Sequence, residues 1–172
     1  MSEPAPEFSR PVSLARLGWE PFHQQIEATA EERERLARRF DLVALDRLTA
    51  VVTLHRQNGG LIRLEAAFAA EFTQDCVVTL EPVAGKLDEE FALVYGPADN
   101  EEGEIDIDAE APVFEPLPLD AIDIGEAVAQ ELSLALPEFP RDPDAIIDPA
   151  TTTETEAGPF AALAKLPRPG QN

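Results

Sequence analysis

The sequence has few of the side chains on which disulfide-bonded proteins, metalloproteins and many enzymes depend. Its 172 residues include one cysteine and two histidines. A single cysteine cannot form an internal disulfide, and a zinc site needs about four ligands. No apolar run approaches the roughly 18 residues of a membrane helix, and the start, Met1-Ser-Glu-Pro-Ala-Pro, does not resemble a signal peptide. We therefore expect a cytoplasmic monomer, with no membrane partner, cofactor or metal.

Basic residues are also scarce. The chain has 13 Lys and Arg against 34 Asp and Glu, which gives a formal net charge of -21. Residues 1–63 hold nine basic and nine acidic residues, whereas residues 64–172 hold four and 25. Phosphate backbones are bound by Lys and Arg, so the chain as a whole is a poor nucleic-acid binder. The acidic second half favours a basic partner. The competing explanation is that the charge only maintains solubility.

What the sequence does contain is a regular pattern of apolar residues. A helix is predicted over 29–45, where Thr29 and Glu32 have capping-box spacing, and a second over 123–136, with Asp123 as its N-cap. Short strands are expected near 10–14 and 24–27, and a further strand near 91–95. We expect an α+β fold in which an antiparallel sheet is covered by the two helices.

A hairpin is the clearest local prediction. Residues 48–55 alternate between apolar and polar positions, and Asn58-Gly59 favours a tight turn with positive φ at both residues. Even positions from 62 to 80 are mostly apolar and odd ones mostly polar, which predicts one buried face that includes Cys76. Because this run is longer than a usual strand, a bend or bulge is expected near 73–75.

The remaining segments are predicted to lie outside a single domain core at 10–140. Residues 1–9 are expected to be disordered, and 141–172 to form a flexible, Pro-rich tail. An acidic loop at 97–111 offers Glu101, Glu102, Glu104 and Asp106 to a basic partner, although a merely solvated loop is the simpler reading. In the tail, residues 159–166 can form a short helix that exposes Phe160, Leu163 and Leu166. Such a helix either docks on the domain or serves as a ligand for a partner.

Three arginines form the only candidate RNA-binding group. Arg35, Arg38 and Arg39 lie on the helix face that points away from its apolar side. Glu31 and Glu34 precede Arg35 and Arg38 by four residues, so ion pairs within the helix are the alternative.

Candidate catalytic groups are few. A small hydrolase could use Cys76 with His55, but the alternation places the thiol on the buried face and the imidazole on the exposed one. We therefore assign no catalytic residue, and keep a small enzyme and an acidic nucleic-acid mimic as alternatives.

Four stretches together resemble the YceD family of large ribosomal RNA subunit accumulation proteins. They are Phe72-Thr-Gln-Asp-Cys-Val-Val-Thr-Leu-Glu-Pro-Val83, Pro116-Leu-Pro-Leu-Asp-Ala-Ile-Asp-Ile-Gly-Glu126, Glu131-Leu-Ser-Leu-Ala-Leu-Pro-Glu-Phe-Pro140 and Pro159-Phe-Ala-Ala-Leu-Ala-Lys-Leu166. The helix at 31–40 is similar to that of the proteobacterial branch, so the resemblance spans roughly 10–166. Many relatives carry further cysteines before the Glu-Pro pair or after the second helix, whereas this chain has only Cys76.

The resemblance implies a non-enzymatic role in ribosome biogenesis, namely accumulation of large-subunit ribosomal RNA, in a bacterial cytoplasm. It implies no catalytic residues. A ribosomal protein, an assembly factor or the RNA itself is the expected partner.

Overall fold

The computed structural model describes residues 6–96 and 115–146. The chain divides into two compact units, Met1–Asp142 and Pro143–Asn172. Of the second unit only residues 143–146 are described, and they contain neither a helix nor a strand. The predicted acidic loop, the short helix at 159–166 and the first residues of the N-terminus lie outside the described residues.

The first unit is built on a five-stranded sheet in the order β2-β3-β4-β5-β6. Its strands are β2 (Phe22–Glu27), β3 (Ala44–Arg56), β4 (Ile62–Asp75), β5 (Pro82–Gly96) and β6 (Glu115–Pro116). A separate two-stranded sheet pairs β1 (Pro11–Ser13) with β7 (Ala121–Asp123). Short 3₁₀ turns lie at Leu14–Arg16 and Asn58–Gly60.

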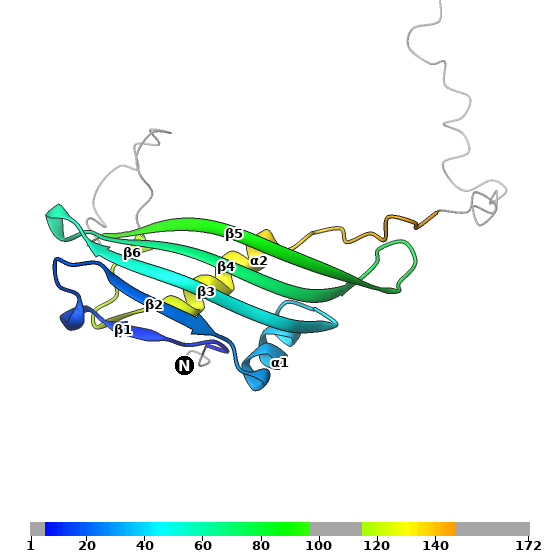
Figure 1. Ribbon diagram of the computed structural model, residues 1–172, viewed down its shortest axis with the longest axis horizontal. Coiled ribbons are helices and arrows are strands. Elements are labelled where there is room, and N and C mark those ends of the chain that lie inside the picture. Colours follow the sequence, from blue (N-terminus) through cyan, green and yellow to red (C-terminus); the bar gives the residue numbers. More distant parts are fainter. Residues whose placement is uncertain (1–5, 97–114, 147–172) are drawn as a thin grey trace, which may run out of the picture. The chain divides into compact units, whose positions relative to one another are not determined.

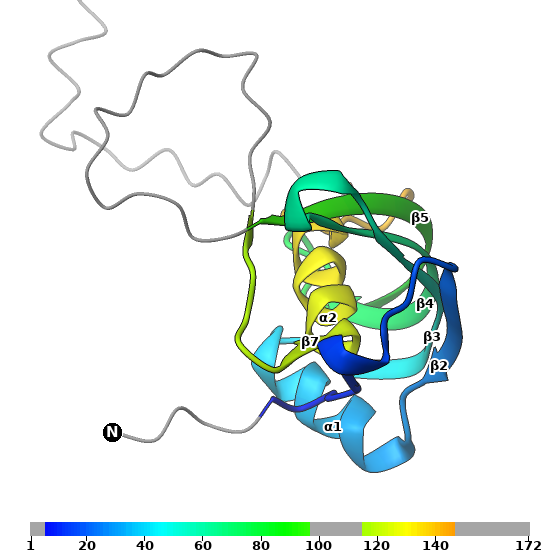
Figure 2. The ribbon, with the colours of Figure 1, turned by 90° about the vertical axis from the view of Figure 1, so that its left-hand side faces the viewer.

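Two helices complete the predicted α+β fold, α1 (Ala30–Arg39) and α2 (Ile124–Ala135). The sheet curls around α2, and α1 packs beside it against the start of β3 (Figures 1 and 2). Even-numbered residues of β4 and the apolar face of α2 form the core between them, with Leu64, Val128 and Leu132 fully buried. One sheet face is therefore covered, as the alternation in the sequence predicts.

The sheet is not purely antiparallel, which corrects one prediction. β2, β3, β4 and β5 pair antiparallel in sequence order, but β6 pairs parallel to the end of β5 through Tyr95 and Gly96. Direct hairpins join β3, β4 and β5, whereas β5 and β6 are separated by residues 97–114. A connection of that length permits the return in the same direction that parallel pairing requires.

Helix capping follows the sequence closely. The Thr29 hydroxyl accepts the Glu32 N–H, and the Glu32 carboxylate accepts the Thr29 N–H, so the predicted capping box is present. Helix α1 nevertheless ends at Arg39, not near 45, because Asp41 adopts a φ of 54° that no helix continues through. Ala44 therefore starts β3 and is not part of the helix face.

The hairpin between β3 and β4 also forms, with a different turn geometry. Positive φ occurs at Gly59 and Gly60, and not at Asn58. The register irregularity lies between Leu45 and Arg47 on β3, and not near 73–75.

The predicted long strand ends earlier than expected. β4 stops at Asp75, and the chain turns back to β5 through Cys76–Glu81. Leu80, expected on the buried face, has a φ of 60° and is 77% exposed. The alternation of a strand cannot hold through a turn, so only Cys76 of this segment is buried.

Candidate binding surface

The lone thiol is buried and has a structural role. Cys76 has no exposed surface, as the sequence predicts. Its Sγ accepts the backbone N–H groups of Val78, Thr79 and Asp142, each at 3.4 Å. These bonds tie the β4–β5 turn to the segment after α2, where the Val77 N–H also donates to the Pro140 carbonyl at 2.9 Å.

Hydrogen bonds to the sulfur also change its acidity. The Thr79 side chain, followed by the N–H groups around the sulfur, lowers the pKa of Cys76 to about 7, and burial opposes this shift. A lowered pKa favours the nucleophilic thiolate, but a reactive cysteine must also be accessible. The Cys76 thiol is buried and therefore not accessible to a substrate.

The structure does not bring Cys76 and His55 together. His55 pairs in register with Arg63 on β4, thirteen residues before Cys76. At about 3.3 Å per strand residue, the two side chains are roughly 40 Å apart. His23 is also distant, because its Nδ1 contacts the Thr53 hydroxyl at 2.9 Å on the same exposed face. The described residues contain no group of three His, Cys, Asp or Glu arranged to hold a metal ion.

The Ile-Asp-Ile-Gly-Glu segment positions the start of α2. Ile122 and Ile124 are buried in the core. The Asp123 carboxylate caps α2 by accepting the N–H groups of Gly125 and Glu126, and it also accepts the Arg10 N–H at 2.7 Å. Asp123 thus fixes the chain before β1 to the N-terminus of α2.

Gly125 and Glu126 also connect the start of α2 to earlier parts of the chain. A Cβ at Gly125 would lie 2.5 Å from the Phe8 carbonyl oxygen, so only glycine allows this close approach. Phe8 itself is fully buried. Glu126 accepts two hydrogen bonds from the Arg39 guanidinium, at 2.8 and 3.0 Å. This motif therefore contributes to packing of the fold.

The α1 arginines are largely engaged within the protein. Arg39 bonds to Glu126 and also to the Glu7 carboxylate at 2.9 Å, and Arg35 donates to the Glu7 carbonyl at 3.4 Å. The ion pairs expected within the helix, to Glu31 and Glu34, are not formed among the described residues. Of the three candidate RNA contacts, Arg39 alone forms an ion pair with a described residue, and Arg38 alone has neither a hydrogen bond nor an ion pair from its guanidinium to the described part of the chain.

The uncovered face of the main sheet, here called the outer face, carries small side chains at its centre. One row across the strands is Gln25, Val51, Ala67 and Glu90, and the next is Glu27, Thr49, Ala69 and Asp88. Val51 is 53% exposed, although it is a large apolar residue in the middle of a strand. No described element covers this face (Figure 1).

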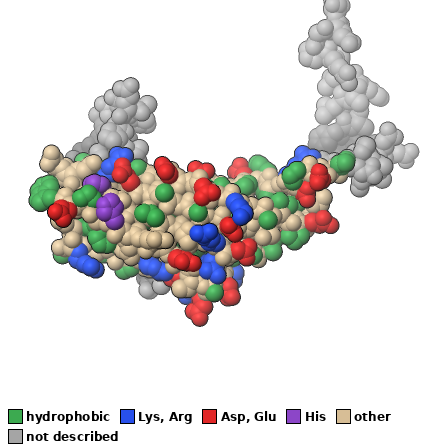
Figure 3. Space-filling view, in the orientation of Figure 1, with side chains coloured by type: hydrophobic (Ala, Val, Ile, Leu, Met, Phe, Trp, Pro, Cys, Tyr) green, Lys and Arg blue, Asp and Glu red, His purple; other side chains and the backbone are tan. Residues whose placement is uncertain are grey.

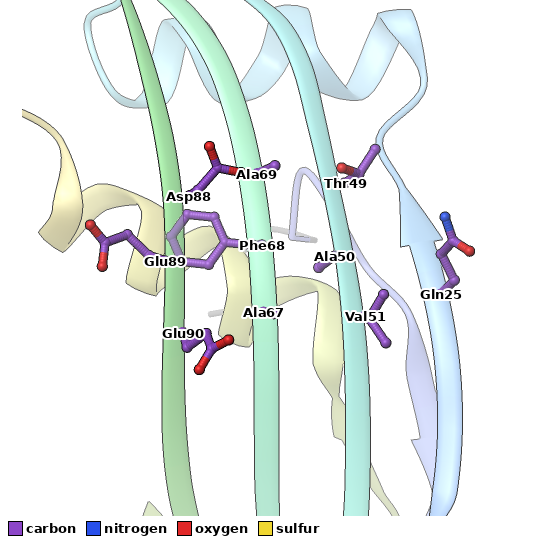
Figure 4. Close-up of a pocket in the computed structure, with 10 residues that line it drawn as sticks. All are labelled: Gln25, Thr49, Ala50, Val51, Ala67, Phe68, Ala69, Asp88, Glu89 and Glu90. Atoms are coloured by element: carbon purple, nitrogen blue, oxygen red, sulfur yellow. The ribbon is translucent and has the colours of Figure 1, made fainter.

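A shallow groove crosses the outer face. Two adjacent hollows of about 330 and 600 Å³ share Val51, Ala67 and Glu90, so they are continuous. Asp88 and Glu90 extend from β5 above the alanines of β4 (Figure 4). Acidic and basic side chains are interspersed with apolar ones across this face (Figure 3).

The acidic side of the groove has free negative charge. Glu71 pairs with Lys86 at 3.0 Å and Glu65 with Arg63 at 2.8 Å, whereas Asp88 and Glu90 form no ion pair with a described residue. An apolar floor beside unpaired carboxylates suits a Lys or Arg side chain, whose stem is apolar and whose head is charged.

These residues were not identified from the sequence. The signal was present in Ala67 and Ala69, small apolar residues at odd positions of β4, on the side away from the core, and in the consecutive acids Asp88-Glu89-Glu90. The acidic and apolar candidates that the sequence analysis proposed lie outside the described residues. They are Glu101, Glu102, Glu104, Asp106, Phe160, Leu163 and Leu166.

Comparisons with known proteins agree with the resemblance seen in the sequence. The model of the family described as Large ribosomal RNA subunit accumulation protein YceD matches residues 64–167, from β4 past α2. Residues 10–63, including α1, lie outside the match. No curated protein and no solved structure matches the chain. None of the described helices is long and apolar enough to cross a membrane. The match covers more than half of the 172 residues and includes the buried Cys76 and the start of α2. The chain therefore belongs to the YceD family, whose name denotes accumulation of large-subunit ribosomal RNA.

Proposed function

We propose that the protein supports accumulation of large-subunit ribosomal RNA as a binding factor, not as an enzyme, and that it binds a basic ribosomal protein or assembly factor. The observation that carries this proposal is the outer face of the sheet. There, Asp88 and Glu90, which form no ion pair within the described ranges, lie beside an apolar floor of Val51 and Ala67.

Protein is favoured over RNA as the direct partner because of where the charges are. RNA backbones are bound by clustered Lys and Arg. Arg39 is paired with the carboxylates of Glu7 and Glu126, and Arg35 donates to the Glu7 backbone carbonyl, which leaves Arg38 as the one candidate whose guanidinium bonds to no described residue. The 25 acids of residues 64–172, against four bases, repel phosphate and attract basic proteins.

The experiment is affinity purification of the tagged full chain from bacterial lysate at low salt. We expect large-subunit ribosomal proteins or their assembly factors to be recovered, and recovery to fall as salt screens the charges. The test variant is Asp88→Lys with Glu90→Lys. The control is Glu20→Lys with Glu81→Lys, which makes the same change in net charge at exposed positions outside the groove.

Loss of the basic proteins in the test variant alone supports the proposal. Equal recovery by wild type and both variants contradicts the assignment to the outer face. Displacement of the bound proteins by DNA, with the control variant as weak as the test variant, would instead favour an acidic nucleic-acid mimic.

A further inference from the structure

Strand β5 has a long unpaired edge. Among the described residues it pairs on its outer side only with β6, and only at Tyr95 and Gly96. On its other side it pairs with β4 without interruption from Pro82 to Tyr95. The stretch Pro82–Val94 therefore forms an open sheet edge about a dozen residues long (Figure 1). Such an edge carries backbone donors and acceptors that can pair with another chain.

The pairing with β6 shows which residues direct these groups outward. The Gly96 carbonyl accepts the Leu117 N–H at 2.7 Å, so the backbone groups of Gly96 point away from β4. Backbone groups alternate sides along a strand, and the register with β4 has no irregularity. The even-numbered residues of β5 consequently direct their N–H and C=O groups to the open edge, where from Pro82 to Ala92 no described residue bonds to them. In the middle of the strand they are Lys86, Asp88, Glu90, Ala92 and Val94.

The same residues place their side chains on the outer face. Asp88 and Glu90 lie next to Ala69 and Ala67 in the register. An added strand would therefore meet free backbone groups and free carboxylates at the same positions. Its own side chains on the outer face would continue the groove.

Charge selects the occupant of this edge. Asp88, Glu89 and Glu90 are consecutive, exposed and in the middle of the edge. A second copy paired edge to edge would bring like charges together, which is destabilising between neighbouring strands. Glu89 lies on the inner side, opposite Phe68, which is a known way to discourage uncontrolled pairing. A basic segment has the opposite charge, so the acidic residues attract it to the edge and do not oppose its pairing.

We propose that β5 binds an extended basic segment of the partner protein as an added strand, with Lys or Arg at alternate positions beside Asp88 and Glu90. This inference rests on the proposed function, since it specifies how the basic partner is held. Backbone hydrogen bonds would provide affinity, and the alternate basic side chains would provide selectivity.

The first test uses three synthetic ten-residue peptides of alternating Lys and Val. One is unmodified, the second is N-methylated at every Lys, and the third at every Val. In an added strand only one of these two sets of N–H groups faces β5. We expect one methylated peptide to bind the full-length protein about tenfold more weakly, because several backbone hydrogen bonds are lost, and the other to bind like the unmodified peptide.

The outcomes separate strand addition from simple charge attraction. Equal binding of all three peptides, an equal loss for both methylated peptides, or no binding of any peptide overturns the proposed strand addition. Purification of basic large-subunit proteins with wild type, and not with the variant of Asp88 and Glu90, would still support the proposed function in each of those cases.

A second test alters the edge of the protein without altering its charge. Ala92→Pro removes one N–H that faces outward, and edge strands tolerate proline at such positions. The matched control, Ala92→Thr, keeps that N–H and a β-favouring side chain. We expect the proline variant to melt near the wild-type temperature and to bind the unmodified peptide about tenfold more weakly, and the control to bind normally. A folded proline variant that binds like wild type overturns the inference.

Discussion

Arg39 at the end of α1 donates two hydrogen bonds to Glu126 in the first turn of α2, across 87 positions of sequence. The carboxylate lies near the positive end of the α2 dipole, and the guanidinium near the negative end of the α1 dipole. Each charge therefore stabilises its own helix through the dipole, and the two charges also attract each other. The pair joins two helices that share no other ion pair among the described residues.

Replacing Arg39 tests how much this ion pair stabilises the fold. Arg39→Ala is expected to lower the free energy of unfolding by about 1 kcal/mol, because a bidentate ion pair that is partly shielded from solvent is lost. Urea denaturation measures the change. The control is Arg38→Ala, on the same helix and without an ion pair to a described residue, for which we expect less than about 0.5 kcal/mol. Equal effects would show that the Arg39 contacts contribute nothing specific.

Gly125 is expected to tolerate no side chain. A methyl group there would overlap the Phe8 carbonyl oxygen, and backbone on both sides must move to relieve the overlap. We expect Gly125→Ala to destabilise the protein by about 1–3 kcal/mol, seen as a lower thermal midpoint. Gly18→Ala is the matched control, since the nearest atom to its Cβ position is 4.0 Å away. A Gly125 variant as stable as the control would contradict the close packing of Phe8 against α2.

The Cys76 thiol should resist labelling in the native protein. Its pKa of about 7 makes thiolate available at pH 8, but its surface is not exposed, so reaction requires local opening. We expect a thiol reagent to react roughly 100-fold more slowly in buffer than in concentrated urea. A control with Cys76→Ala and Ser133→Cys carries its only thiol at an exposed position of α2 and should label rapidly. Equally rapid labelling of native wild type would revive a nucleophilic role.

Stability at low pH should depend on Glu32. The hydrogen bonds from Arg10, at 2.7 and 2.9 Å, and the Thr29 N–H lower the pKa of Glu32 from its ordinary 4.5 to about 2. A carboxyl group with a lowered native pKa stabilises the fold above pH 4.5, and this contribution is lost as the pH falls toward 2. Glu32→Gln should therefore be less stable than wild type at pH 7 by about 1–2 kcal/mol.

The difference should narrow as the solution is acidified. Urea titrations of both proteins between pH 7 and pH 2.5 measure it. A constant difference across that range would show that ionisation of Glu32 does not contribute.

Local features of the fold were predictable because their causes are local. The capping box of Thr29 and Glu32, the N-cap of Asp123 and the buried even positions of β4 each depend on residues a few positions apart. The early end of α1 and the turn after Cys76 were not predictable from periodicity. Both depend on positive φ at residues other than glycine, Asp41 and Leu80, which residue type does not predict.

The long-range features had no signal in a single sequence. The parallel strands β5 and β6 are separated in sequence by residues 97–114, and Arg39 is separated from its partner Glu126 by most of the domain. The candidate surface was missed for a different reason. Alternation predicts which side of a strand faces away from the core. It does not predict whether another element of the fold covers that side.

The pairing of β1 with β7 has a consequence for synthesis of the protein itself. Pro11 pairs with Asp123, more than one hundred residues later, and the Phe8 backbone packs against Gly125. At about 5–20 residues per second, the first strand must wait several seconds after it has been made. The hairpins of β3, β4 and β5 can form earlier on the emerging chain, and the domain closes only when α2 has left the exit tunnel.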